Sequence, residues 1–492
     1  MQGRSRIQDL RERRELPRLL PLQQEDVRPR SGFRFFSRRY AKCSISLLLI
    51  LCALVLLAQL YSPEAIEHLY GDMRVYAPTE HSKLPSLFVK YSEDEQRTSK
   101  ENLLRWKEQG LQERYLRLPA RRQRSGWGPF MQELILNTYL ANRIDRIFVL
   151  DNFTWHEDGW MDYVDHRQGQ YSMPVQIPVS AVIRAVTPAG VDPQMIRAVG
   201  KDLWDEACPR GRMVHGLEAP PVVGRHLQAS MPLKEDVSDS RSQCLELYEF
   251  PSTSNDMGST LLDIWPTLSN SSILTHFGWS PLVELAFDMN RELIAPVTDL
   301  EPYLSSLPFT NSSDRYRPIP GLLSLHVPRG IYQDYCRGLA PGSQGFTGFN
   351  AFPSFPDVFD PAKLAHLGEA ARTAVYHRRC YPIIQEIVRR VDIVRHTEAG
   401  KGLRDVYIMT NAPTPWVLEL KTALRRMGGW ASVSSTRDLV LSREQRYVKQ
   451  AVEMLVAQRA QVFIGNGFST MSGQVGMLRV ANGLLVESTR HW

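Results

Sequence analysis

The stretch AQVFIGNGFSTMSGQVGMLR, residues 460–479, decides the fold of this chain. Its apolar run 462–464 breaks at Gly465-Asn466-Gly467, and an apolar, helix-like segment resumes at Val475. A buried parallel strand that turns into a helix has this pattern. The start of such a helix offers unpaired N–H groups and a partial positive charge, which suit a phosphate. For one glycine-rich turn alone, the alternative is a tight turn whose hydroxyls only cap the helix.

The last third of the chain repeats this alternation. Its order predicts a parallel sheet covered on both faces, a Rossmann-like half whose ligands bind at the carboxyl ends of the strands. At two of these ends the chain has 326–329 (HVPR) and 465–469 (GNGFS), and we expect both to meet at a phosphate. The expected strands are 321–327, 405–410, 431–435, 461–464 and 483–488, and the expected helices are 381–396, 415–427, 444–460 and a last one that ends near 481.

An earlier α/β unit begins after the basic stretch 121–124. The turn at Gly126 and Gly128 leads into a segment with helical apolar spacing and then into the strand-like run 147–150. Basic residues beside a glycine turn suit a bound anion. The alternative is that this stretch is an ordinary solvated loop. The Pro-rich interval from about 158 to 313 is typical of a segment that shapes an acceptor site.

The charge of the chain is concentrated at its start. Residues 1–42 carry twelve Arg or Lys against five acids, a net of +7, whereas the whole chain has a net charge of +6. The remainder is therefore close to neutral. A basic head on a neutral body argues against a general nucleic-acid surface, so we expect no nucleic-acid partner.

An uncharged run of 19 residues, CSISLLLILCALVLLAQLY at 43–61, follows the basic head. This length crosses a hydrocarbon core of about 30 Å, and no cleavage site follows it. We therefore predict an uncleaved transmembrane signal-anchor with a cytoplasmic tail at 1–42, because basic flanks stay cytoplasmic. This topology predicts a single-pass type II protein of the Golgi or ER membrane, with a polar stem at 62–118 and a lumenal body.

Four of the six cysteines lie outside the predicted span. They allow three pairings, of which the spacing favours Cys208–Cys244 and Cys336–Cys380 in an oxidising compartment. Sequons at Asn152, Asn270 and Asn311 predict a glycoprotein in such a compartment.

Three motifs in order resemble those of the GDP-fucose protein O-fucosyltransferases and their relatives, the alpha-1,6-fucosyltransferases. FIGNGFSTMS (463–472) resembles the C-terminal phosphate loop F-I-G-N-x-x-S-S of that superfamily, most closely in its fungal members. LSLHVPRGIYQDYC (323–336) stands where the family has H-x-R-R-G-D, and SGWGPFMQEL (125–134) resembles its N-terminal glycine-rich loop. The resemblance covers about residues 120–492. It implies a GT-B-like α/β fold in which two Rossmann-like domains, 119–315 with the acceptor site and 316–492 with the GDP-sugar site, face a cleft.

The resemblance also implies roles for single residues. Ser469 and Thr470 would hold the β-phosphate, and Glu453 would accept hydrogen bonds from the guanine edge, where a carboxylate fits two parallel donors. The chain has no D-x-D, so cationic side chains and helix N-termini would stabilise the departing diphosphate, and we expect neither a metal nor another cofactor. The implied GDP-sugar-binding residues are Gly126, Gly128, His326, Arg329, Glu453, Gly465, Asn466, Ser469 and Thr470.

The chain departs from the family at its catalytic strand, where Pro328 replaces the first Arg and Ile331 replaces the Asp. His326 and Arg329 remain as the candidate catalytic residues, because a guanidinium suits a phosphate; Arg378 and Arg379 are an alternative source of charge. We therefore expect a metal-independent glycosyltransferase that moves fucose from GDP-fucose to a hydroxyl of a protein or glycan. The alternative is a GDP-sugar-binding relative without transfer activity, while an NAD-linked dehydrogenase is disfavoured because no G-x-G-x-x-G follows a first strand. The candidate general bases are Glu133, Asp151 and Asp334.

Overall fold

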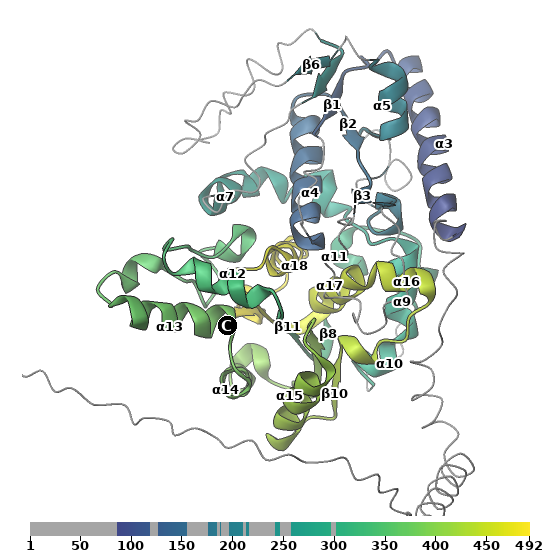
Figure 1. Cartoon of the computed structure of the whole chain (residues 1–492). Coiled ribbons are helices and arrows are strands. Elements are labelled where there is room, and N and C mark those ends of the chain that lie inside the picture. The colour runs from purple at the N-terminus through teal and green to yellow at the C-terminus, as the bar shows by residue number, and fades with distance from the viewer. Residues whose placement is uncertain are drawn as a thin grey trace, which may run out of the picture. The chain divides into compact units, whose positions relative to one another are not determined.

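Two five-stranded parallel β-sheets organise the computed structural model of the chain (Figure 1). All described residues belong to one compact unit, Tyr76–Trp492, which includes both sheets. A two-stranded antiparallel ribbon pairs β3 (Phe153–Thr154) with β4 (Gln176–Ile177). The described part is therefore α/β with parallel sheets, as the alternating pattern predicted. The structure describes residues 86–118, 126–154, 176–184, 187, 196–209, 213–215, 242–246, 257–296 and 302–492.

The C-terminal sheet has the strand order β10-β9-β8-β11-β12. In chain order this reads 3-2-1-4-5, so the winding direction reverses between the neighbours β8 and β11. A reversal of this kind opens a crevice at the carboxyl ends of the two strands, where open α/β sheets bind ligands. The strands are β8 (Ile319–His326), β9 (Asp405–Met409), β10 (Ser432–Ser435), β11 (Ala460–Gly465) and β12 (Thr489–His491).

Alternate side chains of this sheet pack into two different cores. Leu323 and Leu325 of β8 join Ile464 and the apolar side chains of α14 and α15. Leu322 faces the opposite core, which includes α17 and α18. Because side chains alternate along a strand, His326 shares the face of Leu322 and points toward α17 and α18.

The N-terminal sheet has the strand order β5-β2-β1-β7-β6, and its winding direction reverses between β1 and β7. Part of the predicted stem belongs to this sheet, since β1 is its middle strand and α3 packs against it through the buried Trp106. The strands are β1 (Tyr115–Arg117), β2 (Ile147–Leu150), β5 (Ala198–Gly200), β6 (Met213–His215) and β7 (Cys244–Glu246).

Helices connect the strands of both sheets (Figure 1). Their bounds are α3 (Ser86–Glu108), α4 (Trp127–Arg143), α5 (Lys201–Ala207), α7 (Met257–Leu268), α8 (Ser272–Thr275), α9 (Pro281–Met289), α10 (Arg291–Ile294), α11 (Ser312–Arg315), α12 (Tyr332–Leu339), α13 (Glu369–Cys380), α14 (Ile384–Arg395), α15 (Thr414–Arg426), α16 (Arg443–Tyr447), α17 (Lys449–Arg459) and α18 (Thr470–Ala481).

Two elements differ from their predicted form. The helix expected at 444–460 is divided at Val448 into α16 and α17. The strand expected at 483–488 was wrong: this segment starts with Gly483 at φ +75°, ends in a 3-10 turn and exposes Leu485 to 71%. The strand that completes the sheet is β12, the next three residues, because Thr489 and His491 are the side chains that the core buries.

The predicted N-terminal transmembrane helix, and with it the single-pass membrane localisation, needs correction. No helix within the described ranges is both long and apolar enough to cross a membrane. The longest of them, α3, has 23 residues, but charged side chains recur along it. The segments 1–42, 43–61 and 62–85, for which we predicted the tail, the anchor and the first part of the stem, lie outside the described residues.

Both disulfides favoured by the spacing of the cysteines are confirmed. Cys208 is bonded to Cys244 in β7, and Cys336 in α12 is bonded to Cys380 at the end of α13. The second bond joins α13 to α12, and a hydrogen bond of 2.6 Å from Asn466 Nδ2 to the Cys380 carbonyl holds the end of α13 against the loop after β11.

Candidate functional site

The carboxyl ends of β8 and β11 meet at the start of α18. Ser472, in the first turn of α18, joins them: its hydroxyl lies 2.7 Å from His326 Nδ1 at the end of β8 and accepts a hydrogen bond of 2.9 Å from the Asn466 N–H after β11. All three residues are buried. The two strand ends that the sequence predicted to meet are therefore linked directly, at the point where the sheet reverses its winding.

Burial and Ser472 set the environment of the His326 ring. Burial lowers the pKa of His326 from 6.5 to about 4, so the imidazole is neutral near pH 7. Its Nδ1 lies 2.7 Å from Ser472 Oγ, which also accepts from the Asn466 N–H. In the tautomer in which Nδ1 accepts from this hydroxyl, the ring proton is on Nε2, which is then a neutral donor.

Backbone amides at the start of α18 add further donors. Ser469 precedes the helix without a side-chain cap, and its carbonyl is held by Asn350 Nδ2 at 2.8 Å. Within the described residues, the N–H groups of Thr470, Met471 and Ser472 donate to no acceptor. Three aligned amides and a helix N-terminus make this place favourable for an anion.

The glycines of the loop before α18 have a packing role that the sequence did not indicate. A Cβ at Gly467 would lie 2.3 Å from the Phe346 ring, and one at Gly465 would lie 3.0 Å from Ser472 Cβ. Asn466 between them is fully buried, and its Oδ1 accepts from the Phe468 N–H. Gly465 and Asn466, two of the predicted ligand residues, therefore shape the loop against its own surroundings together with Gly467. Of the predicted residues, Ser469 and Thr470 are the ones beside the free amides.

The start of α4 touches the start of α18. A Cβ at Gly128 would lie 2.5 Å from the Met471 amide nitrogen and 2.8 Å from Thr470 Oγ1. Farther along, Gln474 Nε2 donates to Gln132 Oε1 at 3.1 Å, so the two helices lie side by side. The two glycine turns that the sequence singled out are thus brought together, and two helix N-termini converge at one place.

Replacing Gly128 by Ala is expected to destabilise this contact by about 1–3 kcal/mol, because its new methyl group would overlap the backbone of α18. Gly126 is the matched control, since a Cβ there meets nothing within 4 Å. Thermal unfolding of the two variants checks the prediction. Equal midpoints for Gly128→Ala and Gly126→Ala would contradict the contact.

The carboxyl edge of the N-terminal sheet carries a charged cluster next to α4. Arg117 at the end of β1 bonds Glu246 at the end of β7, at 2.9 Å, and Asp151 just after β2, at 3.4 Å. This is the reversal point of that sheet. Phe153 stacks on Trp127 at the start of α4 with ring centroids 4.1 Å apart, so this edge and the α4–α18 contact belong to one region.

Glu453 lies on α17 at the carboxyl ends of β9 and β10. It is 1% exposed, and its carboxylate accepts a hydrogen bond from Thr436, whose hydroxyl also accepts from the Thr410 N–H at 2.9 Å. Burial raises the pKa of Glu453 from 4.5 to about 7. Its surroundings therefore favour the protonated carboxyl.

Replacing Glu453 by Gln is expected to remove one pH-dependent component of stability. In the unfolded chain the carboxyl ionises near pH 4.5, and in the folded chain near pH 7, so the free energy of unfolding falls as pH rises through this window. At about 1.4 kcal/mol per pKa unit, the loss is roughly 3 kcal/mol. Urea unfolding at pH values on both sides of the window checks this. Relative to the wild type, the free energy of unfolding of the Gln variant should rise only on the alkaline side. A constant difference across the window would refute it.

Arg329 is enclosed instead of facing the α18 loop. Its guanidinium lies over the rings of Tyr381 (4.2 Å) and Trp416 (4.3 Å) and donates to the Pro382 carbonyl. Burial lowers its pKa to about 10, at which the group is still charged near neutral pH. None of these partners belongs to the 465–472 loop, so the structure does not bring this guanidinium together with Ser469 and Thr470.

Several residues of this region were not among the predicted site residues. Ser472 was noted only as a small hydroxyl, although its place one helical turn after Ser469 would have indicated a neighbour of the same loop. Asn350, Gln132 and Gln474 gave no signal in the sequence, because their contacts join segments far apart in the chain. Over the described ranges, no group of three or more His, Cys, Asp or Glu side chains could hold a metal ion.

Comparisons with known proteins find similarity at the level of solved structures. A crystal structure of POFUT1 in complex with GDP is 14% identical, with a TM-score of 0.43, and the match covers 77% of this chain and 98% of that chain. POFUT1 in complex with GDP-fucose matches with 14% identity, the same coverage and a TM-score of 0.44. The POFUT1 apo-form matches with 14% identity and a TM-score of 0.42, over 77% of this chain and 97% of that chain. No family model and no curated protein matches the chain. Nothing about its activity follows from similarity at this level.

Proposed function

We propose that this chain is a metal-independent glycosyltransferase that transfers fucose from GDP-fucose to a hydroxyl group of a protein or glycan. The observation that carries the proposal is that Ser472 joins the neutral imidazole of His326 to the start of α18, where the amides of Thr470, Met471 and Ser472 donate to no acceptor within the described residues, at the reversal point of the C-terminal sheet. These donors are neutral and held in place by the helix and the strand end. They suit the negative charge that grows on a departing diphosphate.

The rest of the nucleotide follows the edge of the sheet in this proposal. With the phosphates at α18, the guanine lies toward the carboxyl ends of β9 and β10, where Glu453 holds Thr436. The glycine turn at Gly126 and Gly128 lies beside the diphosphate in this proposal, because α4 begins against α18. The motif resemblance supports this orientation, since it assigns Ser469 and Thr470 to the β-phosphate and Glu453 to the base.

Asp151 is the best placed of the three candidate bases. It follows β2 directly at the reversal edge of the N-terminal sheet, is 16% exposed at its side chain and is oriented by Arg117. Asp334 instead points to solvent, 79% exposed and paired with Arg337. Glu133 lies within α4 and not at a strand end. A base at Asp151 would accept the acceptor hydroxyl proton while the sugar leaves the diphosphate.

One experiment tests the proposal on the full chain. Calorimetry with GDP, and with ADP as the matched control for the base, measures nucleotide binding; release of GDP from GDP-fucose in the presence of glycan or peptide acceptors, with and without EDTA, measures transfer. We expect GDP to bind more tightly than ADP and turnover to persist in EDTA. Absence of GDP binding would reject the site, and activity lost in EDTA would reject metal independence.

A second candidate function is GDP-sugar binding without transfer. Two observations favour it: Pro328 has neither charge nor donor where the family has an arginine, and the neighbouring Arg329 is enclosed by Tyr381 and Trp416. GDP binding with no turnover on any acceptor would select this candidate.

A further inference from the structure

A chain of hydrogen bonds runs from β12 to the start of α18. At its centre is Asn350, a fully buried residue of the 3-10 turn Gly348–Ala351. Its Nδ2 donates to the Ser469 carbonyl at 2.8 Å and to the Thr347 carbonyl at 3.0 Å. Its Oδ1 lies 3.1 Å from His491 Nε2. Segments that are far apart in the sequence therefore meet at this one side chain.

The partners of Asn350 determine the direction of each bond. Two carbonyls lie at one end of its amide, so this end is the NH₂ group. The other end is the oxygen, which can only accept, and His491 Nε2 is therefore the donor in this contact. Burial lowers the pKa of His491 from 6.5 to about 3, so the ring donates as a neutral imidazole near pH 7.

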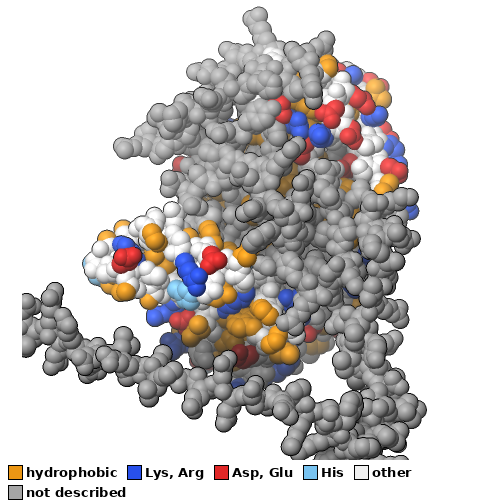
Figure 2. All heavy atoms as spheres, viewed as in Figure 1, with side chains coloured by type: hydrophobic (Ala, Val, Ile, Leu, Met, Phe, Trp, Pro, Cys, Tyr) orange, Lys and Arg blue, Asp and Glu red, His pale blue; other side chains and the backbone are white. Residues whose placement is uncertain are grey.

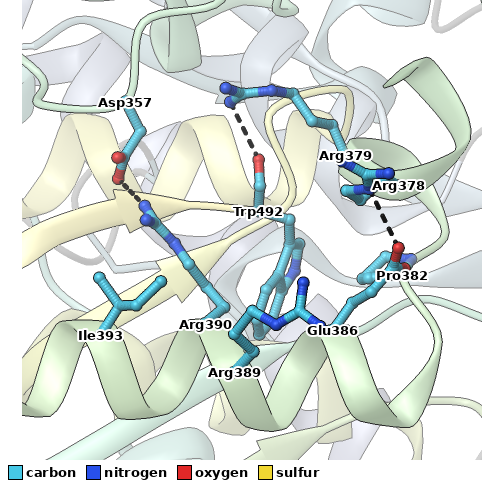
Figure 3. A pocket seen from close by; sticks show the side chains of 9 residues that line it. All are labelled: Asp357, Arg378, Arg379, Pro382, Glu386, Arg389, Arg390, Ile393 and Trp492. Atoms are coloured by element: carbon cyan, nitrogen blue, oxygen red, sulfur yellow. Dashed lines mark hydrogen bonds and ion pairs between the residues drawn. The ribbon is translucent and has the colours of Figure 1, made fainter. Parts of the chain in front are cut away.

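The end of β12 holds the His491 ring in place. The backbone N–H of His491 donates to Asp357 Oδ2 at 3.1 Å, and Asp357 also pairs with Arg390 of α14 (Figure 3). The His491 ring packs against Phe346 and Phe355, with ring centroids 5.0 and 5.5 Å away. The donor to Asn350 is therefore fixed by the strand end and by its aromatic neighbours.

The peptide between Ser469 and Thr470 is the last link of the chain. Its carbonyl accepts from Asn350 Nδ2 and also from the Gly473 N–H, at 3.0 Å, as the helix begins. In a planar trans peptide the carbonyl and the N–H point in opposite directions, so holding the Ser469 carbonyl fixes the direction of the Thr470 N–H. Each amide of the chain accepts at its oxygen and donates at its nitrogen, and hydrogen bonds aligned in this way polarise one another. The polarised chain ends at one of the free amides of α18.

The arginines of α13, which the sequence offered as an alternative source of positive charge, are engaged with other partners. Arg378 pairs with Glu386 at 3.1 Å, and Arg379 bonds a main-chain oxygen of Trp492 at 3.2 Å (Figure 3). Figure 2 shows Lys and Arg side chains at the surface in this region. The chain through Asn350 is instead buried and uncharged, so salt in solution screens it less than it screens such surface cations.

We infer that Asn350, oriented by His491, is a positioning residue of the diphosphate site. It holds and polarises the peptide between Ser469 and Thr470, so that the Thr470 N–H donates to the diphosphate of the nucleotide. This role rests on the proposed function, because it concerns the same site and the same anion. The groups of the chain are oriented before the anion arrives, and donors fixed in this way stabilise negative charge without reorganisation.

The ratio of GDP affinity to GMP affinity, measured by calorimetry on the full chain at constant ionic strength, tests this role. The ratio isolates the contribution of the second phosphate, whereas a smaller folded fraction lowers both affinities equally. Asn350→Leu removes the donor to the Ser469 carbonyl. We expect it to lower the ratio about tenfold, the effect of losing one hydrogen bond to a charged group.

Asn290→Leu is the matched control. Asn290 is also buried, and its amide has the same kinds of partners: Nδ2 donates to the carbonyls of Ala286 and Val440, and Oδ1 accepts from the Val440 N–H, each at 2.8 Å. None of these partners belongs to the 465–472 loop. The control should therefore lose stability to a similar extent and keep the wild-type ratio.

Two variants of His491 test the chain one link farther from the anion, and they decide the question if Asn350→Leu does not fold. His491→Phe keeps a ring among the aromatic neighbours but removes the donor to Asn350, so it should lower the ratio, by a smaller factor than Asn350→Leu. His491→Gln can place an amide nitrogen at the Nε2 position and should retain the ratio. If the ring only filled space, Phe would be the better substitute and this order would be reversed.

The outcomes separate the role of Asn350 from the proposed function. A wild type that binds GDP more tightly than GMP, with the same ratio in Asn350→Leu and in His491→Phe, would overturn the role and leave the proposed function intact. An equal fall of the ratio in Asn290→Leu would also overturn it, because Asn350 would then only support the fold. Equal affinities of the wild type for GDP and GMP, or no binding of either, would reject the diphosphate site and the role together.

Discussion

Replacing Arg479 by Met is expected to lower the midpoint of thermal unfolding by about 5 °C or more. Arg479 lies on α18 and is fully buried, without a carboxylate partner among its contacts. Its Nε donates to Thr489 Oγ1 at 2.9 Å, and its two terminal nitrogens donate to carbonyls at the end of α17, in β11 and before β12. One side chain thus ties three segments of the C-terminal sheet together. Its carbonyl partners are those of Ala457, Gln458, Ala460, Gln461 and Ser488.

The size of this effect follows from what the substitution leaves behind. Met fills most of the volume but donates nothing, so several buried carbonyls lose their partner at about 1–3 kcal/mol each. A total of at least about 5 kcal/mol corresponds to the expected shift in a chain of this size. Arg97→Met is the control, because Arg97 is 66% exposed and its loss should change stability by less than about 0.5 kcal/mol. An Arg479→Met midpoint close to that of the control would show that the bonds contribute little.

Arg479 also shows what the sequence could predict and what it could not. Residues 460–479 predicted the strand, the loop and the helix, since apolar runs and glycines are local signals. The role of Arg479 depends on carbonyls of α17, of β11 and of Ser488 before β12, and no local sequence pattern shows which carbonyls lack a donor. A buried cation without a carboxylate has no signature in the sequence.

The candidate site likewise has features that the sequence could predict and features that it could not. His326 and the 465–470 loop were predicted to meet because parallel strands end at one edge, and this geometry follows from strand order alone. The packing of Gly467 against Phe346 and the enclosure of Arg329 between two rings depend on the lengths of intervening loops. The strand at 483–488 failed for a related reason: Leu485 is apolar and yet exposed, so hydrophobicity alone placed the edge strand too early.

Replacing His326 by Asn is expected to reduce turnover of GDP-fucose by about 10²–10³-fold, the usual cost of one donor to a developing oxyanion. The Asn side chain can place its oxygen where Nδ1 accepts from Ser472, but it has no atom at the position of Nε2. Turnover should fall while the midpoint of thermal unfolding stays near that of the wild type. The measurements are release of GDP and thermal unfolding of the same preparation.

His326→Gln is the matched variant, because a Gln amide reaches the Nε2 position and loses the bond to Ser472 Oγ. If the Nε2 proton stabilises the departing diphosphate, Gln should retain more turnover than Asn and be the less stable of the two. If His326 only supports the strand end, the order of turnover reverses, since Asn keeps the buried bond to Ser472. The pH dependence of turnover offers a second readout. Because the pKa of His326 is near 4, turnover that depends on the neutral ring should stay constant from neutral pH down to about pH 5. It should fall at lower pH, as the ring becomes charged. A fall that begins near pH 6.5 would place the imidazole in water instead of beneath the α18 loop.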